Sequence, residues 1–144
     1  MQADFMDLEF MSRTIWGEAR GEGTRGKYAV AYVIMNRARA NRKHYGGGTL
    51  KGVCLKPWQF SCWNKNDPNL PKLKAVELGD PVFNECVKTA LDVMQAASGP
   101  NYGLVDPSQG ATHYYVNGSP TPAWRGAHKP CAIIGRHLFF KGID

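Results

Sequence analysis

Two glutamates in one short segment are the residues best suited to acid and base chemistry. General acid or base catalysis at neutral pH needs a carboxyl, a histidine or a similar group, and the chain holds 12 Asp and Glu residues. Most of these fit ordinary roles as helix-dipole, cap, turn, loop or terminal residues: Asp4, Asp7, Glu9, Asp67, Glu77, Asp80, Glu85, Asp92, Asp106 and Asp144. Glu18 and Glu22 remain, in the segment WGEARGEG. Glu22 either faces the same cleft as Glu18 or caps the following helix near Thr24.

The position of Glu18 predicts a carboxyl with a raised pKa. It falls in the last turn of a helix expected over about residues 4–20, where the negative end of the helix dipole disfavours a carboxylate. Trp16 adds an apolar neighbour, which acts in the same direction. A raised pKa suits a general acid, although an ion pair with Arg20 would oppose it.

Aromatic side chains mixed with amides and hydroxyls form a second candidate feature. Sugar rings present apolar C–H faces and polar rims, which suit indole and phenol side chains. The candidates are Trp16, Trp58, Trp63, Trp124, Tyr114 and Tyr115, with the loop residues Gln59, Phe60 and Ser61 beside them. In a strand, alternation would send one ring of the Tyr114-Tyr115 pair inward and the other outward, so at most one is expected to meet a ligand.

Histidines and cysteines leave two other chemistries open. The histidines show no close metal-ligand spacing, so a zinc site would need ligands from distant positions: His44, His113, His128 and His137. Cys62 with His113 could form a thiol peptidase site, although buried cysteines are commonly inert. The cysteines also match no zinc-ligand spacing and are expected as buried thiols that form disulfides only in an oxidising compartment: Cys54, Cys62, Cys86 and Cys131.

Apolar periodicity predicts helices followed by a small sheet. Spacings of three and four indicate an amphipathic helix over residues 4–20, and an apolar run indicates a central buried helix over residues 24–41. Asp80 and Pro81 open a further helix that Gly99-Pro100 closes, and residues 44–72 are expected as loop with one short helix near 50–55. THYYV and CAIIG…HLFF predict two or three antiparallel strands. The expected fold is α+β, a helix-rich single domain over residues 1–144 with a small antiparallel sheet near the C-terminus.

The charge balance favours an anionic partner. Lys and Arg number 18 against 12 Asp and Glu, a net charge of +6, which suits nucleic acid, teichoic acid, lipopolysaccharide or peptidoglycan. The only loose basic group, Arg37, Arg39, Arg42 and Lys43, is interpreted as a solvated helix end, so nucleic acid is not expected. No stretch approaches the roughly 20 apolar residues that cross a bilayer, so no membrane insertion is expected. The acidic start of the chain does not match a secretory signal, which predicts synthesis in a cytoplasm.

Four motifs in order resemble a known family. TIWGEARGEG with AVAYVIMNR, then QFSCW, ATHYY and IGRHLFF, resemble the SleB/CwlJ type of cell-wall hydrolase, the family of spore-cortex-lytic enzymes and related bacteriophage endolysins. The resemblance runs from about Ser12 to Lys141. It implies a lysozyme- or transglycosylase-like domain, bacterial peptidoglycan as the substrate, Glu18 as the catalytic acid/base, and no metal or other cofactor. The residues expected to contact the substrate are Glu22, Trp16, Gln59, Phe60, Ser61, Trp63, Tyr114 and Tyr115.

The implied reaction is cleavage of the β-1,4 bond between N-acetylmuramic acid and N-acetylglucosamine. A lytic transglycosylase can use one glutamate first as acid and then as base, whereas a muramidase would need a second, water-activating acid such as Glu22. A metal-dependent N-acetylmuramoyl-L-alanine amidase and a non-catalytic wall-binding module are the alternatives. QFSCW and ATHYY depart from the spore enzymes, so spore-cortex specificity is not expected. A lone, basic catalytic domain without a wall-binding repeat or signal peptide is expected to be a monomeric endolysin from a phage of Gram-negative bacteria, which needs a holin to reach peptidoglycan in the periplasm.

Overall fold

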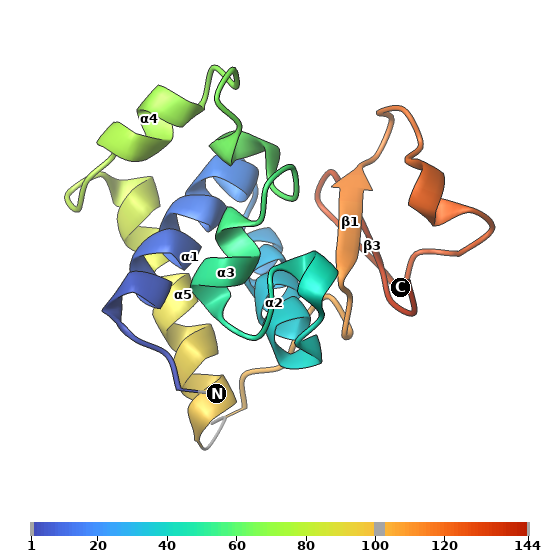
Figure 1. The fold of residues 1–144 in the computed structure, drawn as a ribbon, viewed down its shortest axis with the longest axis horizontal. Helices are drawn as coiled ribbons and strands as arrows, with labels where there is room; N and C mark the ends of the chain where they lie inside the picture. Colours follow the sequence, from blue (N-terminus) through green and yellow to red (C-terminus); the bar gives the residue numbers. More distant parts are fainter. Residues whose placement is uncertain (1, 100–102, 144) are drawn as a thin grey trace.

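The helices come first and the strands last, as expected. The computed structural model describes residues 2–99 and 103–143, so Pro100 and Asp144 lie outside the described residues. The helices are α1 (Phe5–Ala19), α2 (Thr24–Ala40), α3 (Leu50–Leu55), α4 (Leu70–Ala75) and α5 (Pro81–Ser98), and the strands are β1 (His113–Val116), β2 (Ala132–Ile134) and β3 (His137–Phe140). Figure 1 shows the helices as one body with the strands at its side. The predicted α+β class is confirmed. Within the described residues, no helix is long and apolar enough to cross a membrane.

Helix α1 lies within the helical body and contacts α2, α3, α4 and α5 (Figure 1). Asp4 and Asp7 cap its N-terminus reciprocally, each side chain accepting the other residue's backbone N–H. Asp7 also accepts the backbone N–H of Lys51 at 2.8 Å, which ties α3 to the start of α1. Met11 and Ile15 are fully buried on its inner face. These contacts fix the helix whose last turn carries the candidate acid.

Helix α2 is buried on all sides over the stretch that its apolar run predicts. Every residue from Ala29 to Met35 is buried. Arg37, interpreted above as part of a solvated helix end, is buried as well, and that interpretation is wrong for this residue. It lies seven positions after Val30 and four after Val33, so it shares their buried face.

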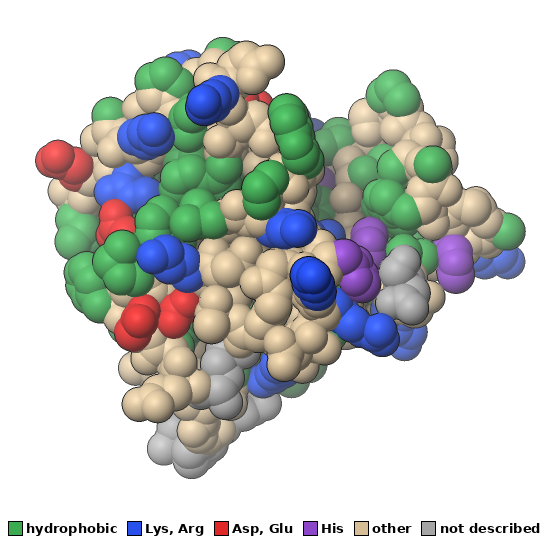
Figure 2. Space-filling model, viewed as in Figure 1, with side chains coloured by type: hydrophobic (Ala, Val, Ile, Leu, Met, Phe, Trp, Pro, Cys, Tyr) green, Lys and Arg blue, Asp and Glu red, His purple; other side chains and the backbone are tan. Residues whose placement is uncertain are grey.

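The three strands form an antiparallel sheet in the order β1-β3-β2. Tyr114 pairs with Phe139 in the register, and their face packs against the helices. Tyr115 and Phe140 pack on Trp124 in a separate cluster, so the alternation predicted for the tyrosine pair is confirmed. Figure 2 shows a hollow between the helical body and this C-terminal segment.

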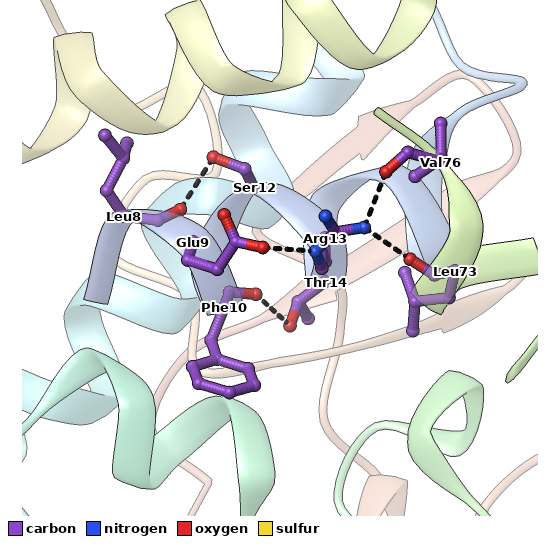
Figure 3. Close-up of polar contacts among 8 residues, drawn as sticks. All are labelled: Leu8, Glu9, Phe10, Ser12, Arg13, Thr14, Leu73 and Val76. Carbon is purple, nitrogen blue, oxygen red and sulfur yellow. Dashed lines mark hydrogen bonds and ion pairs between the residues drawn. The ribbon is translucent and has the colours of Figure 1, made fainter. Parts of the chain in front are cut away.

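Helix α4 was not predicted, because Pro71 was interpreted as a loop signal. The structure corrects the expectation of loop up to residue 72, since the helix spans Leu70–Ala75. Proline fits in the first turn of a helix, where its missing N–H has no partner to lose. Arg13 of α1 secures the other end: its Nη1 donates to the carbonyl oxygens of Leu73 at 2.7 Å and Val76 at 2.8 Å (Figure 3).

Val33→Asp should strongly destabilise the fold. Val33 is fully buried in α2, and a carboxylate there would be an unpaired buried charge. We expect a loss of about 3–5 kcal/mol in the free energy of unfolding, measured by urea denaturation. Leu91→Asp on α5, where the side chain is 40% exposed, is the control and should change stability by less than about 1 kcal/mol. Equal stability of the two variants would contradict the buried assignment of α2.

Candidate active site

Glu18 joins the last turn of α1 to strand β1. The Tyr114 hydroxyl donates to Glu18 Oε1 at 2.7 Å, across a sequence separation of 96 residues. The thiol and backbone N–H of Cys62, from the loop before α4, also hydrogen-bond to this carboxyl. The three elements therefore meet at one half-buried carboxyl group.

Burial raises the pKa of Glu18 above its ordinary value. The hydrogen bonds from Tyr114 and Cys62 favour the ionised form and act in the opposite direction, but burial outweighs them. The negative charge of Asp67, a loop residue passed over in the sequence analysis, adds to the rise. The predicted direction is confirmed, and its main cause is enclosure by other elements rather than the helix dipole alone. A carboxyl of this kind can hold a proton for donation.

The cation that could have opposed this shift is bound elsewhere. Arg20 Nη2 donates to Asn69 Oδ1 at 2.7 Å, and its guanidinium lies 4.3 Å from the centre of the Trp16 ring. Trp16 itself is buried. Arg20 therefore links α1 to the residue that precedes α4.

Cys62 is a poor candidate nucleophile. Burial raises the pKa of its thiol, and the neighbouring Glu18 raises it further, so the reactive thiolate is disfavoured. His113 packs its ring against Tyr45 and Trp124 and shares a hydrogen bond with Thr112. Burial also lowers the pKa of His113 to about 4. The geometry gives no support to the cysteine peptidase alternative.

Arg37 is a buried cation near the site that the sequence analysis missed. Its Nε donates to the carbonyl oxygen of Thr112 at 2.6 Å, and its guanidinium lies 5.2 Å from the centre of the Phe60 ring and 5.4 Å from that of Tyr45. Burial lowers the pKa of Arg37, while nearby tyrosines and Glu18 oppose that shift. Its place on the buried face of α2 was the signal available in the sequence. A fixed positive charge here favours the ionised form of Glu18.

Glu22 and Arg136 form a structural contact between the α1–α2 loop and the β2–β3 turn, which we call the clamp. Its carboxylate accepts the backbone N–H of Arg136 at 3.0 Å and the Arg136 Nε–H at 3.2 Å. Burial acts to raise the pKa of Glu22, but these bonds and the positive charge of Arg136 outweigh it and lower the pKa. A side chain at Gly135, where φ is +55°, would place its Cβ 2.4 Å from Glu22 Oε1, so a substitution there would be strained and would displace the Glu22 carboxylate. The cap alternative is wrong, because no side chain caps α2 at Gly23.

The clamp reaches the candidate acid through two aromatic rings. His137 is buried, and its Nδ1 lies 3.4 Å from Glu22 Oε1. The His137 ring meets the Tyr114 ring edge-on, with centroids 5.0 Å apart. Tyr114 in turn bonds Glu18. Glu22 therefore supports Tyr114, the residue that orients the candidate acid, and it faces the β2–β3 turn.

The remaining residues predicted to contact substrate lie in different surroundings. Gln59 donates its amide to the carbonyl oxygens of Tyr45 and Val53, and Phe60 is buried. Tyr115 packs on the far face of the sheet, where its hydroxyl accepts from Arg125. Substrate contact stays a prediction for the whole set, which is Trp16, Glu22, Gln59, Phe60, Ser61, Trp63, Tyr114 and Tyr115. Among the described residues, no three His, Cys, Asp or Glu side chains are grouped so that they could hold a metal ion.

Comparisons with known proteins point to one family. Residues 21–140 match the family model described as Cell Wall Hydrolase. The chain is 29% identical to the spore cortex-lytic enzyme of Halalkalibacterium halodurans over 92% of its own length and 34% of that protein. It is 30% identical to the spore cortex-lytic enzyme of Oceanobacillus iheyensis over 94% of its own length and 41% of that protein. The chain thus spans less than half of these relatives.

Solved structures extend the likeness to the fold. The catalytic domain of the germination-specific lytic transglycosylase SleB from Bacillus anthracis superposes with a TM-score of 0.70 at 25% identity, covering 96% of each chain. The catalytic domain of the Bacillus cereus SleB protein gives a TM-score of 0.71 at 25% identity, covering 97% of this chain and 93% of that one. The expected lysozyme- or transglycosylase-like fold is confirmed by these neighbours.

Tyr114→Phe should raise the pKa of Glu18 further. The lost hydroxyl is a donor that favours the ionised carboxyl, so its removal leaves burial less opposed. An NMR titration of the Glu18 side-chain carboxyl carbon measures the change. Tyr115→Phe, which removes a hydroxyl on the opposite face of the sheet, is the matched control and should leave the pKa of Glu18 unchanged. A lower Glu18 pKa in Tyr114→Phe would contradict this account.

Proposed function

This chain belongs to the cell wall hydrolase family, and we propose that it is a lytic transglycosylase acting on bacterial peptidoglycan. The proposed scissile bond is the β-1,4 link between N-acetylmuramic acid and N-acetylglucosamine. The observation that carries the proposal is the half-buried Glu18, whose pKa is raised by burial and whose carboxyl is oriented by Tyr114. The likeness to the SleB catalytic domains supports the same reaction class.

In the proposed reaction one carboxyl acts twice. Protonated Glu18 donates its proton to the glycosidic oxygen as the bond from that oxygen to C1 of the muramic acid breaks. The resulting carboxylate then takes the proton of the muramic acid 6-hydroxyl, whose oxygen attacks C1. The products are an N-acetylglucosamine end and a 1,6-anhydromuramic acid end. Water is not consumed, and Glu18 regains its proton.

Mass spectrometry of the released fragments tests both the bond and the residue. Purified peptidoglycan treated with the wild type should yield 1,6-anhydromuramic acid ends, and Glu18→Gln should lower their formation by at least about 100-fold. Glu22→Gln is the matched control: since Glu22 lies in the clamp, this variant should keep the anhydro product even if it is less stable.

Other product ends would overturn the proposal in distinct ways. Reducing muramic acid ends would indicate a muramidase and point to Asp67 or Glu22 as the water-activating group. Free stem peptides would indicate an amidase.

Melting curves show whether the variants are folded. Because burial penalises the ionised form of Glu18, its pKa is higher in the folded than in the unfolded chain. Ionisation of Glu18 therefore costs stability above the ordinary glutamate pKa of 4.5, so Glu18→Gln should melt no lower than the wild type at neutral pH.

We further propose that the chain is a monomeric phage endolysin, made in the host cytoplasm, that reaches peptidoglycan in the periplasm through a holin. The net charge of +6, which suits anionic wall polymers, supports this role. Figure 2 shows histidines and several Lys and Arg side chains gathered beside the boundary between the helical body and the C-terminal segment.

Co-expression tests the endolysin role. A Gram-negative host should lyse when the chain is produced together with a holin, and should remain intact with the chain alone, with the holin plus Glu18→Gln, or with the Glu18→Gln variant alone. The optical density of the culture reports the lysis. Rapid lysis by the chain alone would contradict the need for a holin.

A further inference from the structure

A groove lies in the loop between α3 and α4, and its lining includes Asp67, whose charge acts on Glu18. Two adjoining hollows of about 410 Å³ and 250 Å³ share Trp58, Asn64 and Asn66. We call them together the Trp58 groove, which is lined by Leu55, Lys56, Pro57, Trp58, Trp63, Asn64, Lys65, Asn66, Asp67 and Pro68.

Trp58 is held in an unfavourable backbone conformation and displayed to solvent. Its φ is +69°, and it is the third residue of a turn in which the backbone N–H of Gln59 donates to the carbonyl oxygen of Lys56 at 3.1 Å. Turns with proline second and a positive φ third normally place glycine or asparagine there. The Trp58 side chain is 81% exposed, so burial does not offset the strain. Folding gains little from tryptophan at this position, which indicates a ligand contact.

The frame around Trp58 is rigid on both sides. The Gln59 amide donates to the carbonyl oxygens of Tyr45 at 2.9 Å and Val53 at 2.7 Å, which holds the turn from within. The Trp63 indole N–H donates to Thr14 Oγ1 at 2.9 Å, which holds the far wall of the groove against α1. The groove is thus preorganised on the helix that carries the candidate acid.

The lining chemistry suits an N-acetylated sugar. An exposed indole offers a flat apolar face for the C–H side of a sugar ring, and the Asn64 and Asn66 amides can exchange hydrogen bonds with hydroxyl and acetamido groups. Lys56 and Lys65 at the wall provide charge for the carboxylates of a wall peptide. The negative charge of Asp67, which lines the smaller hollow, disfavours a string of phosphates, and this argues against nucleic acid.

Two residues relate the groove to Glu18. Asp67 lines it, and the charge of Asp67 acts on the Glu18 carboxyl. Cys62, adjacent to the groove residue Trp63, hydrogen-bonds to that same carboxyl. A glycan strand seated at Glu18 can therefore extend along the 56–68 loop.

From these contacts we infer that the Trp58 groove is a distal glycan subsite that stacks an N-acetylhexosamine ring on Trp58, one or more sugars away from the cleaved bond. The inference rests on the glycan-cleaving function proposed above and assigns Trp58 a binding role rather than a catalytic one.

Binding measured in an inactive background tests the subsite separately from catalysis. The probe is the β-1,4-linked tetramer of N-acetylglucosamine, titrated by calorimetry into the chain carrying Glu18→Gln. Adding Trp58→Gly should weaken binding on the order of ten-fold, which corresponds to about 1.4 kcal/mol. Glycine suits the positive φ, so this variant should fold at least as well as its parent. Phe5→Ala, which removes an aromatic ring that is 75% exposed at the start of α1, is the matched control and should leave the affinity unchanged.

Kinetics and competition complete the test. With Glu18 intact, Trp58→Gly should raise KM for peptidoglycan fragments and change kcat little, as expected for a residue that binds without reacting. Equal affinity of Trp58→Gly and its parent for the tetramer would overturn the subsite. A single-stranded oligonucleotide that displaces the tetramer and binds more tightly through Trp58 would overturn it as well. Tetramer binding that depends on Trp58, combined with stem peptides as the only products, would keep the subsite and refute the proposed reaction.

Discussion

The hydrogen bond from Tyr114 to Glu18 is the contact on which the arrangement of this molecule depends. In an isolated α1, Glu18 would lie at a frayed, solvated helix end, where the helix dipole would act on its pKa without burial. Burial arises only when β1 and the loop containing Cys62 close on that end. The site thus forms by docking the sheet onto the helical body, and its electrostatics depend on contacts between parts of the chain that are far apart in sequence.

Two glutamates four positions apart show how surroundings decide the state of one residue type. Glu22 faces a full positive charge at Arg136 together with a backbone N–H, and its pKa is lowered despite burial. Glu18 receives hydrogen bonds from neutral donors, which do not offset burial, and its pKa is raised. The ionised Glu22 holds the β2–β3 turn and thereby the sheet. The sheet in turn buries Glu18, which favours its protonated form.

Local patterns in the sequence predicted the long elements, whereas the details of the site needed the folded chain. Apolar periodicity and capping residues were sufficient to predict α1, α2 and α5. Helix α4 was missed because Pro71 is as typical of a loop as of a first helical turn. Arg37 could have been found from its position on the apolar face of α2. The partner of Glu22 lies 114 residues away, and no local pattern predicts such a pair. The elevated pKa of Glu18 was predicted in direction, while its main cause, enclosure by β1 and the Cys62 loop, was not visible in the sequence.

The balance at Glu18 suits both halves of the proposed reaction. Burial favours the protonated carboxyl that must donate to the leaving oxygen, while the donors on Tyr114 and Cys62 remain in place to stabilise the carboxylate that follows. Arg37 adds a fixed charge that also favours this second state. If the donors were stronger, the acid would lose its proton before the bond broke; if they were weaker, the carboxylate would be too costly to form. In the proposed reaction the 6-hydroxyl has an advantage over water as the attacking group, because it belongs to the same sugar as C1.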